Sequence, residues 1–162
     1  MITKPNILIL EDDKGVVKVL KESYPHYLFT HAENLFDFHG FTFDAPGVEQ
    51  FSLVIMDLQL DMDEFPLSIM RESFPAMFSK PITRLDNQAP LYGWDYYTRI
   101  ICSDDRTIRF ADDKFILLSG CTQFLKDRGY LDKDEYKKII IVDKGIDETQ
   151  KILRDRLSSL KL

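Results

Sequence analysis

Carboxylates follow two apolar runs of the sequence, at the point where each run ends. Residues 7–10 are followed by Glu11 and Asp12, and residues 53–56 are followed directly by Asp57. Three carboxylates at one edge of a fold would repel one another unless a cation joined them. Oxygen ligands of this kind suit a hard ion such as Mg²⁺, which also binds phosphoryl oxygens. The chemistry indicated is metal-assisted transfer of a phosphoryl group to an aspartate oxygen.

A hydroxyl and an ammonium group follow two further apolar runs. Ser119 comes directly after residues 115–118, and Lys144 lies two positions beyond residues 139–142. At the same edge as the carboxylates, these groups would stabilise the phosphoryl oxygens that the cation does not neutralise. Taken alone, Asp57 is equally well explained as a residue that caps a loop. The interpretation as a site depends on all four strand ends together.

The four apolar runs are continuous rather than alternating, which is typical of strands buried on both faces of a parallel sheet. Residues 27–30 form a weaker candidate for a fifth strand. Helix-like segments lie at residues 14–24, at 94–102 and after Gly145. Strands that alternate with helices predict right-handed crossovers and a doubly wound parallel sheet. In such a sheet the functional crevice lies beyond the carboxyl ends of the strands.

Residues 60–92 interrupt this alternation. The segment contains four of the seven prolines, together with Met62, Met70 and Met77. A disordered linker would be poorer in large apolar groups, so we expect an ordered insertion. Two roles for it stay open with equal weight. Its apolar side chains extend the core, or they form a lid or a surface for a partner.

Composition limits the possible functions. A length of 162 residues predicts a single domain spanning 1–162. The net charge of −6 argues against a binder of nucleic acid or of anionic membranes. The start of the chain has no apolar signal region, and no apolar run approaches the roughly 18 residues of a membrane span. Cys102 and Cys121 show neither metal spacing nor a disulfide framework, so we expect a cytoplasmic protein without membrane insertion.

The motifs ILILEDD, LVIMDL, ILLSG and IIIVDKG occur in this order, and together they resemble the receiver domain of two-component response regulators. The resemblance covers nearly the whole chain apart from residues 60–92. It implies a flavodoxin-like five-stranded fold with an insertion of about 28 residues between the third strand and the third helix. It further implies a stand-alone receiver in a phosphorelay that signals by docking to a downstream protein.

The same resemblance implies roles for the acidic residues. Asp57 would accept the phosphoryl group from a sensor histidine kinase or a phosphotransfer protein. Asp12 would bind Mg²⁺ directly together with Asp57, and Glu11 would act through a water molecule. The backbone carbonyl of Gln59 would be the third protein ligand of the metal.

Ser119 matches the residue that bonds the phosphoryl group in this family, and Lys144 matches the lysine that pairs with the phosphoryl charge. Two positions depart from the family pattern. Gly145 stands where a proline usually follows the lysine, and Ile141 stands where many members carry a switching aromatic residue. The glycine leaves the turn after the lysine freer, and the isoleucine argues against coupling of phosphorylation to an output face through an aromatic rotamer.

Two other functions compete with a phosphorylated receiver. The first is a pseudo-receiver, an interaction module that keeps the fold without being phosphorylated. The second is a Mg²⁺-dependent phosphohydrolase that forms an aspartyl-phosphate. Such enzymes usually need a second aspartate two residues after the nucleophile, where this chain has Gln59. We therefore expect no external substrate and at most hydrolysis of the chain's own phosphoryl group.

Overall fold

The computed structural model describes residues 3–60, 66–85, 89–103, 114–132, 140–143 and 146–160. Within these residues, parallel strands form one sheet in the order β2-β1-β3-β6-β7. The strands are β1 (Asn6–Leu10), β2 (Leu28–Ala32), β3 (Leu53–Asp57), β6 (Phe115–Ser119) and β7 (Ile140–Asp143). This order is that of flavodoxin-like doubly wound sheets. The predicted fold class, a five-stranded flavodoxin-like parallel sheet, is confirmed.

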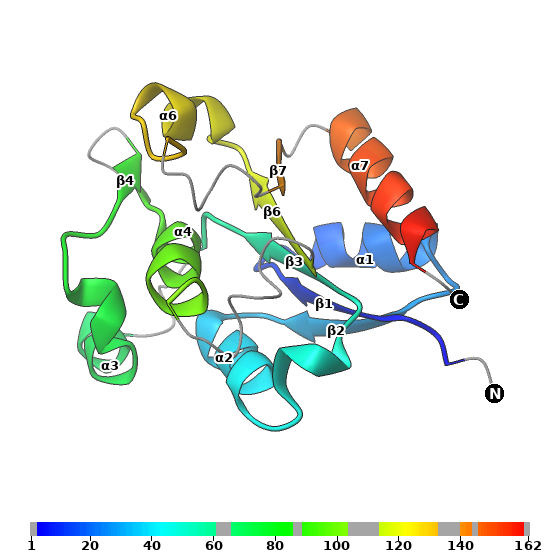
Figure 1. Ribbon diagram of the computed structural model, residues 1–162, viewed down its shortest axis with the longest axis horizontal. Helices are drawn as coiled ribbons and strands as arrows, with labels where there is room; N and C mark the ends of the chain where they lie inside the picture. The colour runs from blue at the N-terminus through cyan, green and yellow to red at the C-terminus, as the bar shows by residue number, and fades with distance from the viewer. Residues whose placement is uncertain are drawn as a thin grey trace.

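Helices cover both faces of the sheet (Figure 1). One face is covered by α1 (Lys14–Ser23) and α7 (Ile146–Ser159). The other face is covered by α2 (Leu35–Phe43), α4 (Tyr92–Tyr96) and α6 (Thr122–Asp127). Along β1, Ile7 and Ile9 pack in the first layer, whereas Leu8 and Leu10 pack in the second. Because successive side chains of a strand point to opposite faces, burial on both sides explains why residues 7–10 of β1 are apolar without interruption.

The register of the strands places their carboxyl ends at one edge. Asp57 of β3 lies opposite Leu118 of β6, and Ser119 of β6 lies opposite Asp143 of β7. The neighbouring strands run in the same direction, so the residues that follow each strand also emerge at this edge. This is the edge at which the sequence predicts a site.

The helix predicted over residues 14–24 is confirmed as α1. It begins after Asp13, whose carboxylate accepts a hydrogen bond of 2.8 Å from the amide of Gly15. Asp13 therefore caps the helix, as expected of an acidic residue at this position. The helix predicted over residues 94–102 consists of α4 and a following π-helical turn (Tyr97–Ile101). None of the helices in the described ranges combines the length and the apolar character needed to cross a bilayer.

The segment that the sequence marks as an insertion is ordered wherever the structure describes it. It contains α3 (Leu67–Ser73), a 3₁₀ turn (Pro75–Phe78) and a hairpin of β4 (Arg84–Leu85) and β5 (Ala89–Pro90). Met70, Phe74 and Met77 are buried in the main core, whereas Met62 lies outside the described residues. The ring of Phe74 lies 5.5 Å from that of Tyr96 on α4. Of the two roles left open by the sequence, these contacts favour an extension of the core.

A buried polar cluster ties this segment to α4. The carboxylate of Asp95 is 1% exposed and accepts hydrogen bonds from the amide (2.8 Å) and the hydroxyl (2.7 Å) of Thr83. It also lies 3.3 Å from the guanidinium of Arg99. Arg99 in turn donates to the backbone carbonyl oxygens of Met77, Lys80 and Pro81. One ion pair therefore fixes two successive stretches of the segment against the helix.

This cluster predicts a pH dependence of stability. Burial raises the pKa of Asp95, although the hydrogen bonds from Thr83 and the charge of Arg99 act in the opposite direction. A carboxyl group whose pKa is higher in the folded state stabilises the fold at low pH, and this contribution is lost as the pH rises through that pKa. Relative to Asp95→Asn, the wild-type protein is therefore expected to gain stability between about pH 7 and about pH 4. Urea denaturation of both proteins at the two pH values measures this difference. A relative gain toward neutral pH would contradict the assignment.

Candidate functional site

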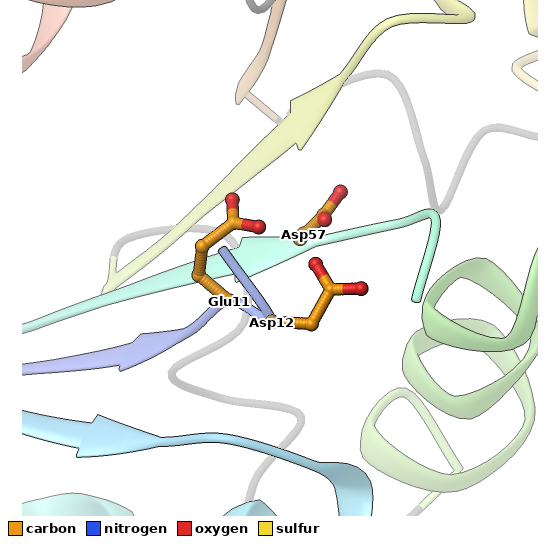
Figure 2. Close-up of side chains that lie close together, drawn as sticks. All are labelled: Glu11, Asp12 and Asp57. Atoms are coloured by element: carbon orange, nitrogen blue, oxygen red, sulfur yellow. The ribbon is translucent and has the colours of Figure 1, made fainter. Parts of the chain in front are cut away.

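Three predicted acidic side chains meet at the carboxyl edge of the sheet. Glu11 and Asp12 follow β1, and Asp57 ends β3 (Figure 2). Oxygen atoms from the three carboxylates all lie within 4.8 Å of one another. Glu11 and Asp57 are fully buried, whereas Asp12 is exposed. The cluster therefore has a protein-enclosed side and one side open to solvent.

The chemistry of this cluster fits a hard cation. Two unit charges about 5 Å apart repel each other by about 3 kcal/mol at an effective dielectric constant of about 20. A divalent cation would replace this repulsion by attraction to every carboxylate. All three donors are carboxylate oxygens, the ligand type that Mg²⁺ and Ca²⁺ prefer. The exposed position of Asp12 leaves room for the water molecules that Mg²⁺ usually keeps.

The backbone around Asp57 holds its carboxylate at this edge. The amide of Gln59 donates a hydrogen bond of 3.1 Å to Oδ1 of Asp57. The amide of Leu58 donates to the carbonyl of Leu118 on β6, and the carbonyl of Leu58 accepts from the amide of Gly93 on α4, both at 3.0 Å. The chain that follows the aspartate is thus bonded to a neighbouring strand and to a helix.

Gly93 allows α4 to approach this turn closely. A Cβ atom at this position would lie 2.3 Å from the carbonyl oxygen of Asp57 and 2.7 Å from the Cα atom of Leu58. Both are backbone atoms, which cannot rotate away. Glycine is therefore required here for steric reasons, because any side chain would displace either the helix or the end of β3.

Ser119 ends β6 and is fully buried. Its hydroxyl oxygen accepts a hydrogen bond of 2.9 Å from the amide of Cys121 and lies 2.9 Å from Sγ of the same residue. The register places Ser119 one position beyond the residue opposite Asp57. Lys144, the predicted ammonium group, lies outside the described residues. The expected contact of the Gln59 carbonyl with a metal stays a prediction.

A histidine beside the cluster was not recognised from the sequence. Nε2 of His31 lies 2.7 Å from the carbonyl oxygen of Glu11. A carbonyl oxygen only accepts hydrogen bonds, so Nε2 carries the proton. His31 lies near the carboxyl end of β2, beside β1. It directly follows the weak strand predicted at residues 27–30, so the strand-end argument would have found it had that strand been included. Of the other histidines, His26 is exposed, and Nδ1 of His39 lies 2.7 Å from the hydroxyl oxygen of Tyr96.

No family model and no curated protein matches the sequence. Solved structures do match. A sensor protein from Polaromonas sp. JS666 shares 17% identity at a TM-score of 0.50, covering 96% of this chain and 94% of its own. The chain has a receiver-like fold. At this identity the likeness concerns the fold alone, which agrees with the strand order described above.

Two further structures overlap less well. The signal receiver domain of an HD domain-containing protein from Pseudomonas fluorescens Pf-5 has 16% identity and a TM-score of 0.49, covering 98% of this chain and 90% of its own. The N-terminal domain of a response regulator receiver protein from Methanoculleus marisnigri JR1 has 14% identity and a TM-score of 0.47, covering 97% and 98%. The case for a receiver's chemistry in this chain therefore depends on the acidic cluster rather than on these overlaps.

Proposed function

We propose that the chain is a receiver in a phosphorelay and that Asp57 accepts a phosphoryl group from a sensor histidine kinase or a phosphotransfer protein. The observation that carries this proposal is the meeting of Glu11, Asp12 and Asp57 within 4.8 Å at the carboxyl edge of the sheet. A strand-terminal aspartate that served only as a cap would not need two further carboxylates beside it.

In the proposed reaction, a carboxylate oxygen of Asp57 attacks the phosphorus atom of a phosphohistidine. The bond between phosphorus and the donor nitrogen breaks, and its electron pair stays on the histidine. Asp12, Asp57 and the carbonyl of Gln59 would hold Mg²⁺, with Glu11 contributing through a water molecule. The metal supplies positive charge to the phosphoryl oxygens. The hydrogen bond from the amide of Gln59 to Oδ1 supports this geometry, because it orients the carboxylate before the donor arrives.

Ser119 and Lys144 would stabilise the remaining phosphoryl oxygens, one by a hydrogen bond and one by charge. Oγ of Ser119 accepts from the amide of Cys121 and lies beside its Sγ, so a hydrogen bond to a phosphoryl oxygen would require the hydroxyl proton to point away from Cys121. Because Cys121 immediately precedes α6 and its amide is bonded to Ser119, a phosphoryl group hydrogen-bonded to this hydroxyl would be connected to the start of that helix. A shift of this helix would change the surface to which a downstream protein target binds. In this proposal the chain acts on no external substrate. A cytoplasmic location is part of the same proposal.

Incubation of the purified chain with acetyl phosphate and Mg²⁺, followed by intact mass spectrometry, tests this function. We expect one added phosphoryl group, and we expect EDTA to prevent its addition. The absence of an adduct with acetyl phosphate and with a phosphorylated phosphotransfer protein would favour the pseudo-receiver.

Substitution of the adjacent residues Asp12 and Asp13 distinguishes an effect on metal binding from an effect on stability. Asp12→Ala is expected to weaken Mg²⁺ binding by at least about tenfold and to leave stability unchanged or higher, because it removes one of three like charges. Asp13→Ala removes the cap of α1 instead, and we expect it to cost about 1 kcal/mol while Mg²⁺ affinity is retained. Calorimetric titration and urea denaturation measure the two quantities. Equal Mg²⁺ affinity in Asp12→Ala and wild type would remove Asp12 from the site.

A further inference from the structure

An open cavity of about 1040 Å³ lies between the segment that follows β3 and helix α6. Its walls come from α3, from residues 78–84 around the start of β4, and from α6 with the turn after it. In Figure 1 these elements lie on the side of the molecule away from α1 and α7. Neither the acidic cluster nor Ser119 lines the cavity, so it is a place distinct from the proposed phosphoacceptor site.

Positive charge is concentrated in this cavity. Five of its lining residues carry a cationic side chain, namely Arg71, Lys80, Arg84, Arg99 and Arg128. None of its described lining residues is an aspartate or a glutamate. The whole chain has the opposite balance, with a net charge of −6. A cluster of this sign on such a chain favours an anionic ligand.

The cationic side chains that line the cavity differ in their contacts. Arg99 is largely committed to the protein, because its guanidinium donates to three backbone carbonyls and pairs with Asp95. It therefore builds the wall of the cavity. Arg71 and Arg128 each lie over an aromatic ring, with the guanidinium carbon 5.6 Å from the ring centre of Phe78 and 5.3 Å from that of Phe124. Stacking of this kind restrains a long side chain and lowers the entropy lost when it binds a ligand.

Aromatic side chains form much of the remaining wall. Tyr92 and Tyr130 line the cavity together with Phe78 and Phe124, and the rings of Phe124 and Tyr130 lie 6.2 Å apart. Flat aromatic groups next to arginines offer a stacking surface to a planar ligand. Arginine also binds phosphate oxygens through two parallel hydrogen bonds. The cavity thus combines arginine side chains, which can bind a phosphate group, with aromatic side chains, which can stack on an aromatic ring of a ligand.

We propose that this cavity binds a nucleotide, that is, an aromatic base that carries one or more phosphate groups. An inorganic phosphate ion would leave the aromatic wall and most of the volume unused. A long nucleic-acid strand would extend beyond the cavity onto a chain of net negative charge, which would repel it. The volume is that of a pocket for a single small molecule. The proposal goes beyond phosphoryl transfer to Asp57 and does not rest on it.

Isothermal titration of the full chain with ADP and with GDP tests the proposal. The buffer contains EDTA and no acetyl phosphate, so the acidic cluster cannot take up a metal-bound nucleotide. We expect saturable binding of at least one nucleotide, with adenosine, guanosine and inorganic phosphate each binding at least about tenfold more weakly. Trp94, the sole tryptophan, lines an adjoining cavity that shares Lys80 and Tyr130, so its fluorescence provides a second signal.

Charge reversal locates the binding. Lys80→Glu and Arg128→Glu change exposed residues that line the cavity, and each is expected to weaken nucleotide binding by at least about tenfold. Lys80→Glu should leave the melting temperature unchanged, whereas Arg128→Glu should lower it slightly because the contact with Phe124 is lost. Lys18 is an exposed residue of α1, which covers the opposite face of the sheet. Lys18→Glu makes the same charge change there and should bind the nucleotides as tightly as the wild-type protein does. Asp57→Asn should also bind like wild type, whether or not Asp57 is a phosphoacceptor.

Several outcomes would overturn the proposal. These are the absence of nucleotide binding at millimolar concentration, and equal affinity in the lining variants and wild type. Inorganic phosphate that binds as tightly as the nucleotides would show an adventitious ion only. A single-stranded RNA oligonucleotide that binds more tightly than ADP and GDP would show a nucleic-acid surface instead.

Discussion

Replacing Gly93 with alanine is expected to lower the free energy of unfolding by about 3 kcal/mol, the upper part of the range for overpacked sites. The new Cβ atom would lie 2.3 Å from the carbonyl oxygen of Asp57 and 2.7 Å from the Cα atom of Leu58. Neither atom belongs to a side chain that could turn aside, so α4 or the end of β3 must move. The amide of Gly93 would also lose its hydrogen bond to Leu58 if the helix moved.

Gly120 provides a matched control for this substitution. A Cβ atom there would meet nothing within 4 Å, although Gly120 follows a strand at the same edge of the sheet. Gly120→Ala is expected to change stability by no more than about 0.5 kcal/mol. Urea denaturation followed by circular dichroism measures both variants. If Gly93→Ala proved as stable as Gly120→Ala, the contact between α4 and the turn after Asp57 would not be as close as described.

Much of the sheet could be predicted from the sequence because its strands are buried on both faces. The four apolar runs correspond to β1, β3, β6 and β7, within about one residue at each end. The edge strand β2 was weaker and was placed at 27–30 instead of 28–32, because its side chains are mostly half-exposed and include polar groups. The strands that carry a continuous apolar run, including the edge strand β7, have a pattern strong enough to fix their ends, whereas β2 does not.

Helix α2 could not be predicted from apolar spacing. Its sequence, LFDFHGFTF, has phenylalanines on two opposite sides of the helix and therefore no single polar face. The structure explains this pattern, because Phe38 packs in the core while Phe36 contacts Phe74 from the segment after β3, with ring centres 5.0 Å apart. A helix covered by a second layer of chain does not need a polar outer face. That layer is visible only in three dimensions.

The meeting of the three carboxylates could be predicted, since it depends only on which residues follow parallel strands. Details that depend on neighbouring helices could not. The steric requirement at Gly93 arises from the path of α4, and the contact of Ser119 with Cys121 arises from the turn before α6. Neither leaves a pattern in the sequence beyond the residue type itself.

Asp57→Asn is expected to abolish labelling by acetyl phosphate, because the amide lacks the carboxylate oxygen that attacks phosphorus. The change is nearly isosteric, so the hydrogen bond from the amide of Gln59 can be retained and the fold preserved. Asp13→Asn is the matched control. It neutralises a carboxylate next to the cluster, keeps a side chain able to cap α1, and should leave labelling intact. Labelling of Asp57→Asn at the wild-type level would contradict the assignment.

The most direct test of the central claim is to locate the phosphoryl group itself. After incubation with acetyl phosphate and Mg²⁺, reduction with borohydride converts an aspartyl phosphate into homoserine, which peptide mass spectrometry can assign to one position. If Asp57 is the acceptor, as the cluster with Glu11 and Asp12 predicts, homoserine will appear at position 57 and only when Mg²⁺ is present. Homoserine at another aspartate, or an unmodified peptide around position 57 from a labelled protein, would contradict the account.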